Sequence, residues 1–324
     1  MSDLTDKVAK KRELQFGCAK LEKLLLASDP LQRTYNELRL PLYVREPGCW
    51  LSAPFGEGKS VAMDYCASAL AAEVPGLPIF KVNEHVLPGN ELRSFLRSAL
   101  IASKYDKPDA TRTDTLRNRL AHHWAELSFS SPLGCVVLLL DEGNSMREAD
   151  EFLLKDLGNE IHMYRGALQT FVFGESPKLD LLVSQRRNVS QNGAVDRLWC
   201  GHKINLHLYE SESDWKSLFQ QMDQEVFREL SNLSIRSFFF GHMDISGYSM
   251  EQEAPRFWRA LESTAKHKGG TVNLRRIFVG IRQAILKTAL DTLDLDVQRF
   301  TGVSEAGWQD ALQYGCVCED SYAK

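Results

Sequence analysis

The first part of the chain alternates between short apolar runs and longer segments whose apolar residues recur at helical spacing. CVVLLL, residues 135–140, is apolar without interruption, which is typical of a strand buried on both faces of a parallel sheet. SVAMDYCASALAAEV, residues 60–74, is rich in alanine and predicts a helix that ends at Pro75 and Gly76. Strands alternating with helices predict an open, doubly wound α/β sheet. Five strands are expected, at residues 48–54, 77–82, 135–140, 168–174 and 202–208.

The pattern changes near Ser211, after which helices dominate. Ser211 and Asp214 have the spacing of a helix start capped by the serine. GGTVNLRRIFVGIRQAILKTAL, residues 269–290, is strongly amphipathic and predicts a helix capped by Asn273. The final stretch has little periodicity and is predicted to be a tail. The chain is thus divided into an N-terminal helical extension at 1–29, an α/β core at 30–210, a small α-helical lid at 211–300 and a C-terminal tail at 301–324.

Composition narrows the function classes. With 39 basic and 43 acidic side chains among 324 residues, the formal charge is −4, so any contact with nucleic acid must be local. Seven cysteines, an odd number, favour reduced cytoplasmic thiols over a disulfide framework. Zinc is not expected at Cys316 and Cys318, because no second Cys or His pair lies beside them. No apolar stretch approaches the roughly 18 residues of a membrane span, and we expect a soluble cytoplasmic protein.

LSAPFGEGKS, residues 51–60, ends like a phosphate-binding loop. Such a loop needs backbone N–H groups at a helix N-terminus, a lysine for the outer phosphates and a hydroxyl for magnesium, and Gly58, Lys59 and Ser60 fit these roles. Ala53 stands where the usual pattern has its first glycine, a position at which a methyl group is tolerable. The predicted ATP-binding residues are Ala53, Pro54, Phe55, Gly56, Glu57, Gly58, Lys59, Ser60 and Val61.

A second motif, VVLLLDE, lies further along the chain, and its Asp141 is 82 residues after Lys59. The buried strand would deliver Asp141, together with Ser60, to Mg²⁺ and would deliver Glu142 to the water that attacks the γ-phosphate. The long gap leaves room for a further strand, so we expect the strand of Asp141 not to neighbour the strand before the loop. The cofactors expected are ATP and Mg²⁺.

These motifs resemble the AAA+ ATPase superfamily over most of residues 30–295, which implies a five-stranded parallel core with a helical lid. The resemblance implies that Glu175 or Ser176, at the end of LQTFVFGES, holds the attacking water. AVDRLW resembles the segment with a trans-acting arginine finger, here Arg197, and NLRRI resembles the second sensor. Arg186 and Arg187 compete for the finger role, and for the second sensor Arg275 is preferred over Arg276.

Within AAA+, the chain most resembles the TnsC/TniB family of transposition regulators. The similarity lies in DE followed by the helical FLLKDLGNEI and in GESPKL after the next strand. The family more often has alanine after DE, and a glycine-threonine pair where this chain has Gly174 and Glu175. The resemblance implies a homo-oligomer, ring or helical filament, that wraps duplex DNA under ATP control. It also implies transposase subunits and a target-selecting adaptor of the TniQ/TnsD type as partners.

A polar connector follows the second strand and its helix, in a region that faces the central channel of AAA+ rings. Its basic residues would track phosphates without reading sequence, and a spiral of subunits would repeat them. The alternative is a solvated surface, because Asp106, Asp109 and Asp114 interleave with the bases. The predicted DNA-contacting residues are Lys104, Lys107, Arg112, Arg117 and Arg119.

Two other functions compete. One is a STAND-like switch in which ATP locks a scaffold, although Glu142 and the lack of a repeat-rich sensor favour a working ATPase. The other is a replication initiator or helicase loader of the Orc/Cdc6 type. Such initiators usually add a winged helix after the lid, for which the 24 residues after Phe300 are too few.

Overall fold

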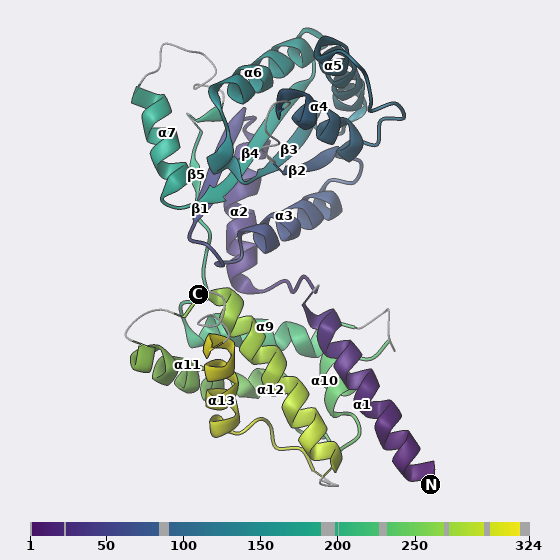
Figure 1. Ribbon diagram of the computed structural model, residues 1–324, viewed down its shortest axis with the longest axis vertical. Coiled ribbons are helices and arrows are strands. Elements are labelled where there is room, and N and C mark those ends of the chain that lie inside the picture. The colour runs from purple at the N-terminus through teal and green to yellow at the C-terminus, as the bar shows by residue number, and fades with distance from the viewer. Residues whose placement is uncertain are drawn as a thin grey trace. The chain divides into compact units, whose positions relative to one another are not determined.

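The computed structural model describes residues 2–22, 24–83, 91–188, 198–199, 201–226, 232–268, 272–294 and 299–317. The chain forms two compact units. The sheet unit comprises Leu31–His207, and the helical unit comprises Met1–Pro30 together with Leu208–Lys324 (Figure 1).

The sheet unit contains a parallel five-stranded sheet with the order β2-β3-β4-β1-β5. The strands are β1 (Gly48–Ala53), β2 (Ile79–Asn83), β3 (Cys135–Asp141), β4 (Ala167–Glu175) and β5 (Lys203–Ile204). The predicted α/β fold is confirmed. So is the expectation that the strand of Asp141 does not neighbour the strand before the loop, because β4 pairs with both β1 and β3.

Helices cover both faces of this sheet (Figure 1). Every residue of β3 from Cys135 to Leu140 is buried, and its side chains alternate between two cores. The core on one face of the sheet includes Leu38, Cys66 and Leu70. The helices after β2 pack on the other face. The helices are α2 (Asp29–Tyr43), α3 (Lys59–Glu73), α4 (Glu91–Ala102), α5 (Thr113–Ser130), the 3-10 turn η1 (Gly143–Ser145), α6 (Glu148–Met163) and α7 (Lys178–Asn188).

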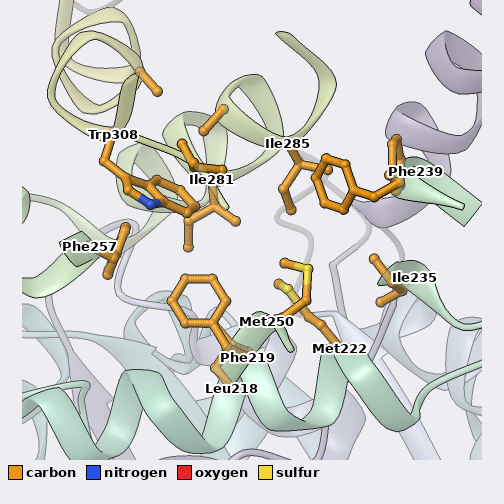
Figure 2. Packing of buried hydrophobic residues seen from close by; sticks show 14 of the residues in the cluster. Leu218, Phe219, Met222, Ile235, Phe239, Met250, Phe257, Ile281, Ile285 and Trp308 are labelled. Atoms are coloured by element: carbon orange, nitrogen blue, oxygen red, sulfur yellow. The ribbon is translucent and has the colours of Figure 1, made fainter. Parts of the chain in front are cut away.

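The helical unit is built around aromatic and branched side chains. Figure 2 shows Phe219 and Met222 of α9 facing Ile281 and Ile285 of α12, with Trp308 of α13 closing the core. The elements of this unit are α1 (Ser2–Leu21), α9 (Glu212–Gln224), α10 (Ile235–Phe240), the 3-10 turn η2 (Met250–Glu253), α11 (Ala254–Lys268), α12 (Leu274–Asp294) and α13 (Glu305–Val317). No helix in the described ranges is long and apolar enough to cross a membrane.

Two predicted helix starts in this unit have the expected caps. The Ser211 hydroxyl accepts a hydrogen bond from the Asp214 backbone N–H, and the Asp214 carboxylate accepts in return from the Ser211 N–H. The Asn273 side-chain oxygen accepts from the backbone N–H of Arg275 at 3.0 Å. Both caps satisfy N–H groups that the first helical turn leaves without intrahelical partners.

The chain after Thr301 differs from the predicted tail, because residues 305–317 form helix α13. Trp308 is fully buried, and its indole N–H donates to the buried carboxylate of Glu253 at 3.0 Å. Glu253 also accepts from the backbone N–H of Val303 at 2.9 Å. Helix α13 is therefore a structural part of the helical unit.

The N-terminal extension also packs into the helical unit. Leu14 of α1 is fully buried, and α1 contacts α12. A Cβ built on Gly17 would lie 2.2 Å from the ring of Phe238, so glycine at this position lets α1 pack closely against Phe238 of α10. The helical unit thus joins segments from both ends of the chain.

Candidate nucleotide-binding site

The loop after β1 has the backbone geometry that its glycines allow. Gly56 and Gly58 have φ angles of 80° and 85°, in the left-handed region that favours glycine. Ala53 lies at the end of β1, pairs in register with Glu175 and is 5% exposed. It is not among the residues with positive φ, so the alanine fits where the usual pattern has glycine.

Lys59 begins α3 and turns its ammonium back onto the loop. Its Nζ donates to the carbonyl oxygens of Ala53 and Pro54, each at 3.0 Å. Burial lowers the pKa of Lys59, while the charges of four carboxylates oppose the shift. The carboxylates are Glu142, Glu175, Asp141 and Glu57. The ammonium therefore sits in a concentrated negative field.

The two predicted motifs meet through a direct hydrogen bond. The Ser60 hydroxyl donates to Oδ2 of Asp141 at 3.0 Å, although the residues are 81 positions apart. The other carboxylate oxygen of Asp141 accepts from the backbone N–H of Glu142 at 2.9 Å. Glu142 is exposed and takes a left-handed conformation, with φ 57° and ψ 33°, as the chain turns into η1. The fold thus gathers a lysine, a hydroxyl and two carboxylates at one loop.

The residue after Glu142 is a glycine because a side chain at this position would clash with β4. A Cβ built on Gly143 would lie 2.1 Å from Cγ1 of Val172 on β4. The turn therefore approaches β4 more closely than an alanine would permit.

The two candidate sensor residues at the end of β4 have different hydrogen-bond partners. The Ser176 hydroxyl donates to Oδ2 of Asp180 at 2.8 Å, and Asp180 also accepts from Ser52 and Lys203. The Glu175 backbone N–H instead donates to the side-chain oxygen of Asn144 at 2.9 Å. Ser176 therefore belongs to a network with α7, whereas Glu175 is tied to the turn that carries Glu142.

Sequence reasoning missed Asn144, Asp180 and Lys178 at this site. Asp180 carries only the signal of an acidic residue in the first turn of a helix, which is ordinary. Asn144 lies beside Glu175 because β3 and β4 are neighbouring strands, which brings the turn after β3 to the end of β4. Lys178 is only three residues after Glu175, so that contact is local in the sequence. No local pattern marks the contact between Asn144 and Glu175, which are 31 residues apart.

The predicted finger residue, Arg197, lies outside the described residues. Its two competitors have partners within their own chain. Arg186 forms an ion pair at 2.9 Å with the buried Glu151, and Arg187 donates to the carbonyl oxygens of Trp199 and Gly201. Arg186 thus joins α7 to α6, and Arg187 joins α7 to the chain before β5.

The second-sensor candidates lie at the start of α12, in the helical unit. Arg275 is exposed and Arg276 is half-buried. Both remain candidates for that role.

The five predicted DNA-contacting residues fall into two groups. Lys104, Lys107 and Arg112 are exposed, and Arg112 lies 3.4 Å from Asp114. The other two have structural contacts. Arg117 pairs with Glu160 of α6 at 3.2 Å, and Arg119 donates to the carbonyl oxygens of Lys107 and Asp109 at 3.0 and 2.8 Å. Arg119 therefore shapes the connector between α4 and α5.

Comparison with known proteins shows the fold. No protein-family model matches the chain, and no curated protein sequence matches it. Among solved structures, the ORC2 protein of Aeropyrum pernix, in ADPNP and ADP complexes, is similar with a TM-score of 0.55 and 16% identity. The match covers 86% of this chain and 65% of that protein, so this chain spans less than two thirds of its length.

Two further solved structures are more distant. A Walker-type ATPase of Pyrococcus abyssi matches with a TM-score of 0.40 and 13% identity, over 86% of this chain and 87% of that one. The ORC1 protein of Aeropyrum pernix, in complex with DNA, matches with a TM-score of 0.39 and 11% identity, over 88% and 83%. The similarity to the ORC2 protein, which has the AAA+ ATPase fold, shows that this chain has the same fold.

Proposed function

We propose that this protein is an AAA+ ATPase that binds and hydrolyses ATP while assembled on duplex DNA. The observation that carries the proposal is the Ser60 to Asp141 hydrogen bond at 3.0 Å, which joins the loop to the buried strand beside Glu142. Lys59 would release the Ala53 and Pro54 carbonyls to bind the outer phosphates. An exposed carboxylate at Glu142 can accept a proton from the attacking water.

The donor set fits Mg²⁺. A serine hydroxyl and an aspartate carboxylate are hard oxygen ligands, and their contact shows that both reach one point. Ser60 and Asp141 would hold the ion together with the nucleotide phosphates. When bound, Mg²⁺ neutralises charge on the phosphate oxygens.

Contact with DNA is proposed for the exposed part of the connector. Lys104, Lys107 and Arg112 would contact phosphates, while Arg119 would hold the connector in shape. Because phosphate contacts carry no base information, binding would be largely independent of sequence. Asp106 and Asp109 partly offset these charges, so several subunits along one duplex would be needed for firm binding.

The finer proposal is a regulator of transposition. Its support is the resemblance of the DE motif, the following helix and GESPKL to the TnsC/TniB family. ATP-bound subunits would form a homo-oligomer, with Arg197 completing the site of a neighbour and Arg275 contacting the nucleotide from the lid. The oligomer would recruit transposase subunits and a TniQ/TnsD-type adaptor in the cytoplasm.

A second candidate function is replication initiation or helicase loading. It is favoured by the fold similarity to the ORC2 protein of Aeropyrum pernix over 86% of this chain. The two candidates share ATP hydrolysis and DNA binding and differ in the partner recruited. Co-sedimentation of the ATP-bound protein on DNA with a transposase or with a replicative helicase separates them.

The primary test is the ATPase rate with and without duplex DNA. Glu142→Gln keeps the size of the side chain but removes the base, so nucleotide binding should survive while the rate falls by about two orders of magnitude or more, roughly 2.7 kcal/mol in the barrier. Lys59→Ala should lose nucleotide binding. Glu126→Gln, exposed on α5, is the matched control and should keep the wild-type rate.

Oligomer lifetime gives the second readout. After ATP is chased with ADP, sedimentation should show Glu142→Gln oligomers persisting on DNA longer than wild type. Normal nucleotide affinity of Lys59→Ala would refute the site. Equal dissociation of wild type and Glu142→Gln would favour the scaffold-switch function.

A further inference from the structure

The end of β4 carries a carboxylate where a neutral polar residue would be expected to hold water. Glu175 contributes, with Glu57, Asp141 and Glu142, to the negative field around Lys59. ATP would bring further negative charge to the same place. An unneutralised Glu175 would therefore oppose binding of the γ-phosphate.

Backbone contacts fix the end of β4 against the phosphate loop. The carbonyl oxygen of Ala53 accepts both from the Lys59 ammonium at 3.0 Å and from the Ser176 backbone N–H at 3.0 Å. The Glu175 N–H is bound to Asn144, two residues after Glu142. The end of β4 is thus attached to the loop through Ser176 and to the turn that carries Glu142 through Glu175.

The partner of Glu175 is a second lysine. Lys178, the first residue of α7, has its Nζ 2.8 Å from Oε2 of Glu175, and its side chain is 64% exposed. The hydrogen bond and charge of Glu175 raise the pKa of Lys178, and Glu142 adds to the shift. Lys178 therefore lies within the field of both Glu175 and Glu142 as a fully charged ammonium.

We propose that Lys178 is a second phosphate-contacting lysine, held by Glu175 when no nucleotide is bound and transferred to the γ-phosphate when ATP binds. The proposal rests on the assignment of this loop as an ATP site. An exposed ion pair contributes little stability, so exchanging the Glu175 carboxylate for a phosphate oxygen costs little. The more highly charged γ-phosphate is the stronger partner for the ammonium. ADP lacks that group, so in the ADP state Lys178 returns to Glu175.

The proposal predicts that Lys178 distinguishes ATP from ADP. We would measure the Kd of AMPPNP and of ADP for the full chain by titration calorimetry. Lys178→Gln should weaken AMPPNP binding by about tenfold, equivalent to 1.4 kcal/mol, and change ADP binding by less than about twofold. Glu175→Gln should tighten AMPPNP binding, because it removes a repelling charge and releases Lys178.

A double variant separates contact with phosphate from mere support of Glu175. If Lys178 touches the γ-phosphate, Lys178→Gln must still weaken AMPPNP binding in the Glu175→Gln background. If that loss disappears, or if AMPPNP and ADP weaken equally, the proposal is overturned. Lys81→Gln, which removes another half-exposed lysine paired with a carboxylate in the sheet unit, is the matched control and should change neither Kd.

The Lys59→Ala variant distinguishes a failure of the ATP-site assignment from a failure of the role proposed for Lys178. Normal affinity of Lys59→Ala for both nucleotides would refute the ATP site itself. Loss of both nucleotides in Lys59→Ala, with no effect of Lys178→Gln on AMPPNP, would refute the role of Lys178 alone.

Discussion

Replacing Trp308 by alanine should destabilise the helical unit severely, although this residue lies in the segment that the sequence pattern predicts as a tail. The indole is fully buried, and its ring centroid lies 5.1 Å from that of Phe257 and 5.7 Å from that of Phe219 (Figure 2). Its N–H donates to the buried Glu253. The substitution removes both the packing and the donor.

The magnitude follows from these two losses. Truncating a buried tryptophan to alanine costs about 3–5 kcal/mol. Trp308→Phe keeps much of the ring but leaves one Glu253 oxygen without its donor, which costs about 1–3 kcal/mol. With a urea slope of about 2 kcal/mol per M, the midpoint should fall by roughly 2 M for alanine and roughly 1 M for phenylalanine. Whole-protein stabilities are about 5–15 kcal/mol, so both variants should still fold.

Urea unfolding followed by far-UV circular dichroism measures these shifts. Tyr314→Ala is the control on the same helix, because Tyr314 is 53% exposed and should change the stability by less than about 0.5 kcal/mol. For the same reason, deleting residues 303–324 should unfold the helical unit. Equal midpoints for Trp308→Ala and Tyr314→Ala would refute the placement of α13 in the core.

Two further predictions concern DNA and pH. Reversing the charges of Lys104 and Lys107 should weaken duplex binding equally on unrelated sequences, because phosphate contacts carry no base information. The slope of log K against log salt concentration should fall by about 0.9 per lost contact, which filter binding at several salt concentrations measures. A sequence-selective defect would contradict this. Burial raises the pKa of Glu253 above its ordinary value of 4.5, despite the hydrogen bonds to its carboxyl group. The folded state therefore keeps the Glu253 carboxyl protonated at pH values where the unfolded state has lost the proton. The free energy of unfolding should fall as the pH rises from 4.5 through the raised pKa. In urea unfolding, Glu253→Gln should flatten that decline, and an unchanged slope would show that another group causes it.

Elements whose signals lie within a few residues could be predicted from the amino-acid sequence alone. The apolar run of β3, the glycines of the loop and the caps at Ser211 and Asn273 each act within a few residues of chain, so their patterns survive in the sequence. The DE motif also placed Asp141 at a strand end, where parallel strands deliver side chains to one edge.

The segment that forms helix α13 has apolar residues at helical spacing, but this pattern is weak. Its buried residues Trp308, Ala311, Leu312 and Cys316 follow helical spacing, but two of them are small. Small residues are used because α12 and α13 approach closely: a Cβ on Gly315 would lie 2.5 Å from the carbonyl oxygen of Arg276. Such packing lowers the apolar content on which pattern analysis depends.

Which residues lie together at the nucleotide site could be seen only in the folded chain. The Ser176 hydroxyl donates to Asp180, while Asn144 and Lys178 bind Glu175. The contact of Asn144 with Glu175 depends on strand order, because the pairing of β3 with β4 brings together turns 31 residues apart. The contacts of Asp180 with Ser176 and of Lys178 with Glu175 are local in the sequence. Hydrogen bonds and charge act through space over a few ångströms, and a linear pattern contains no record of distances that the sheet alone creates.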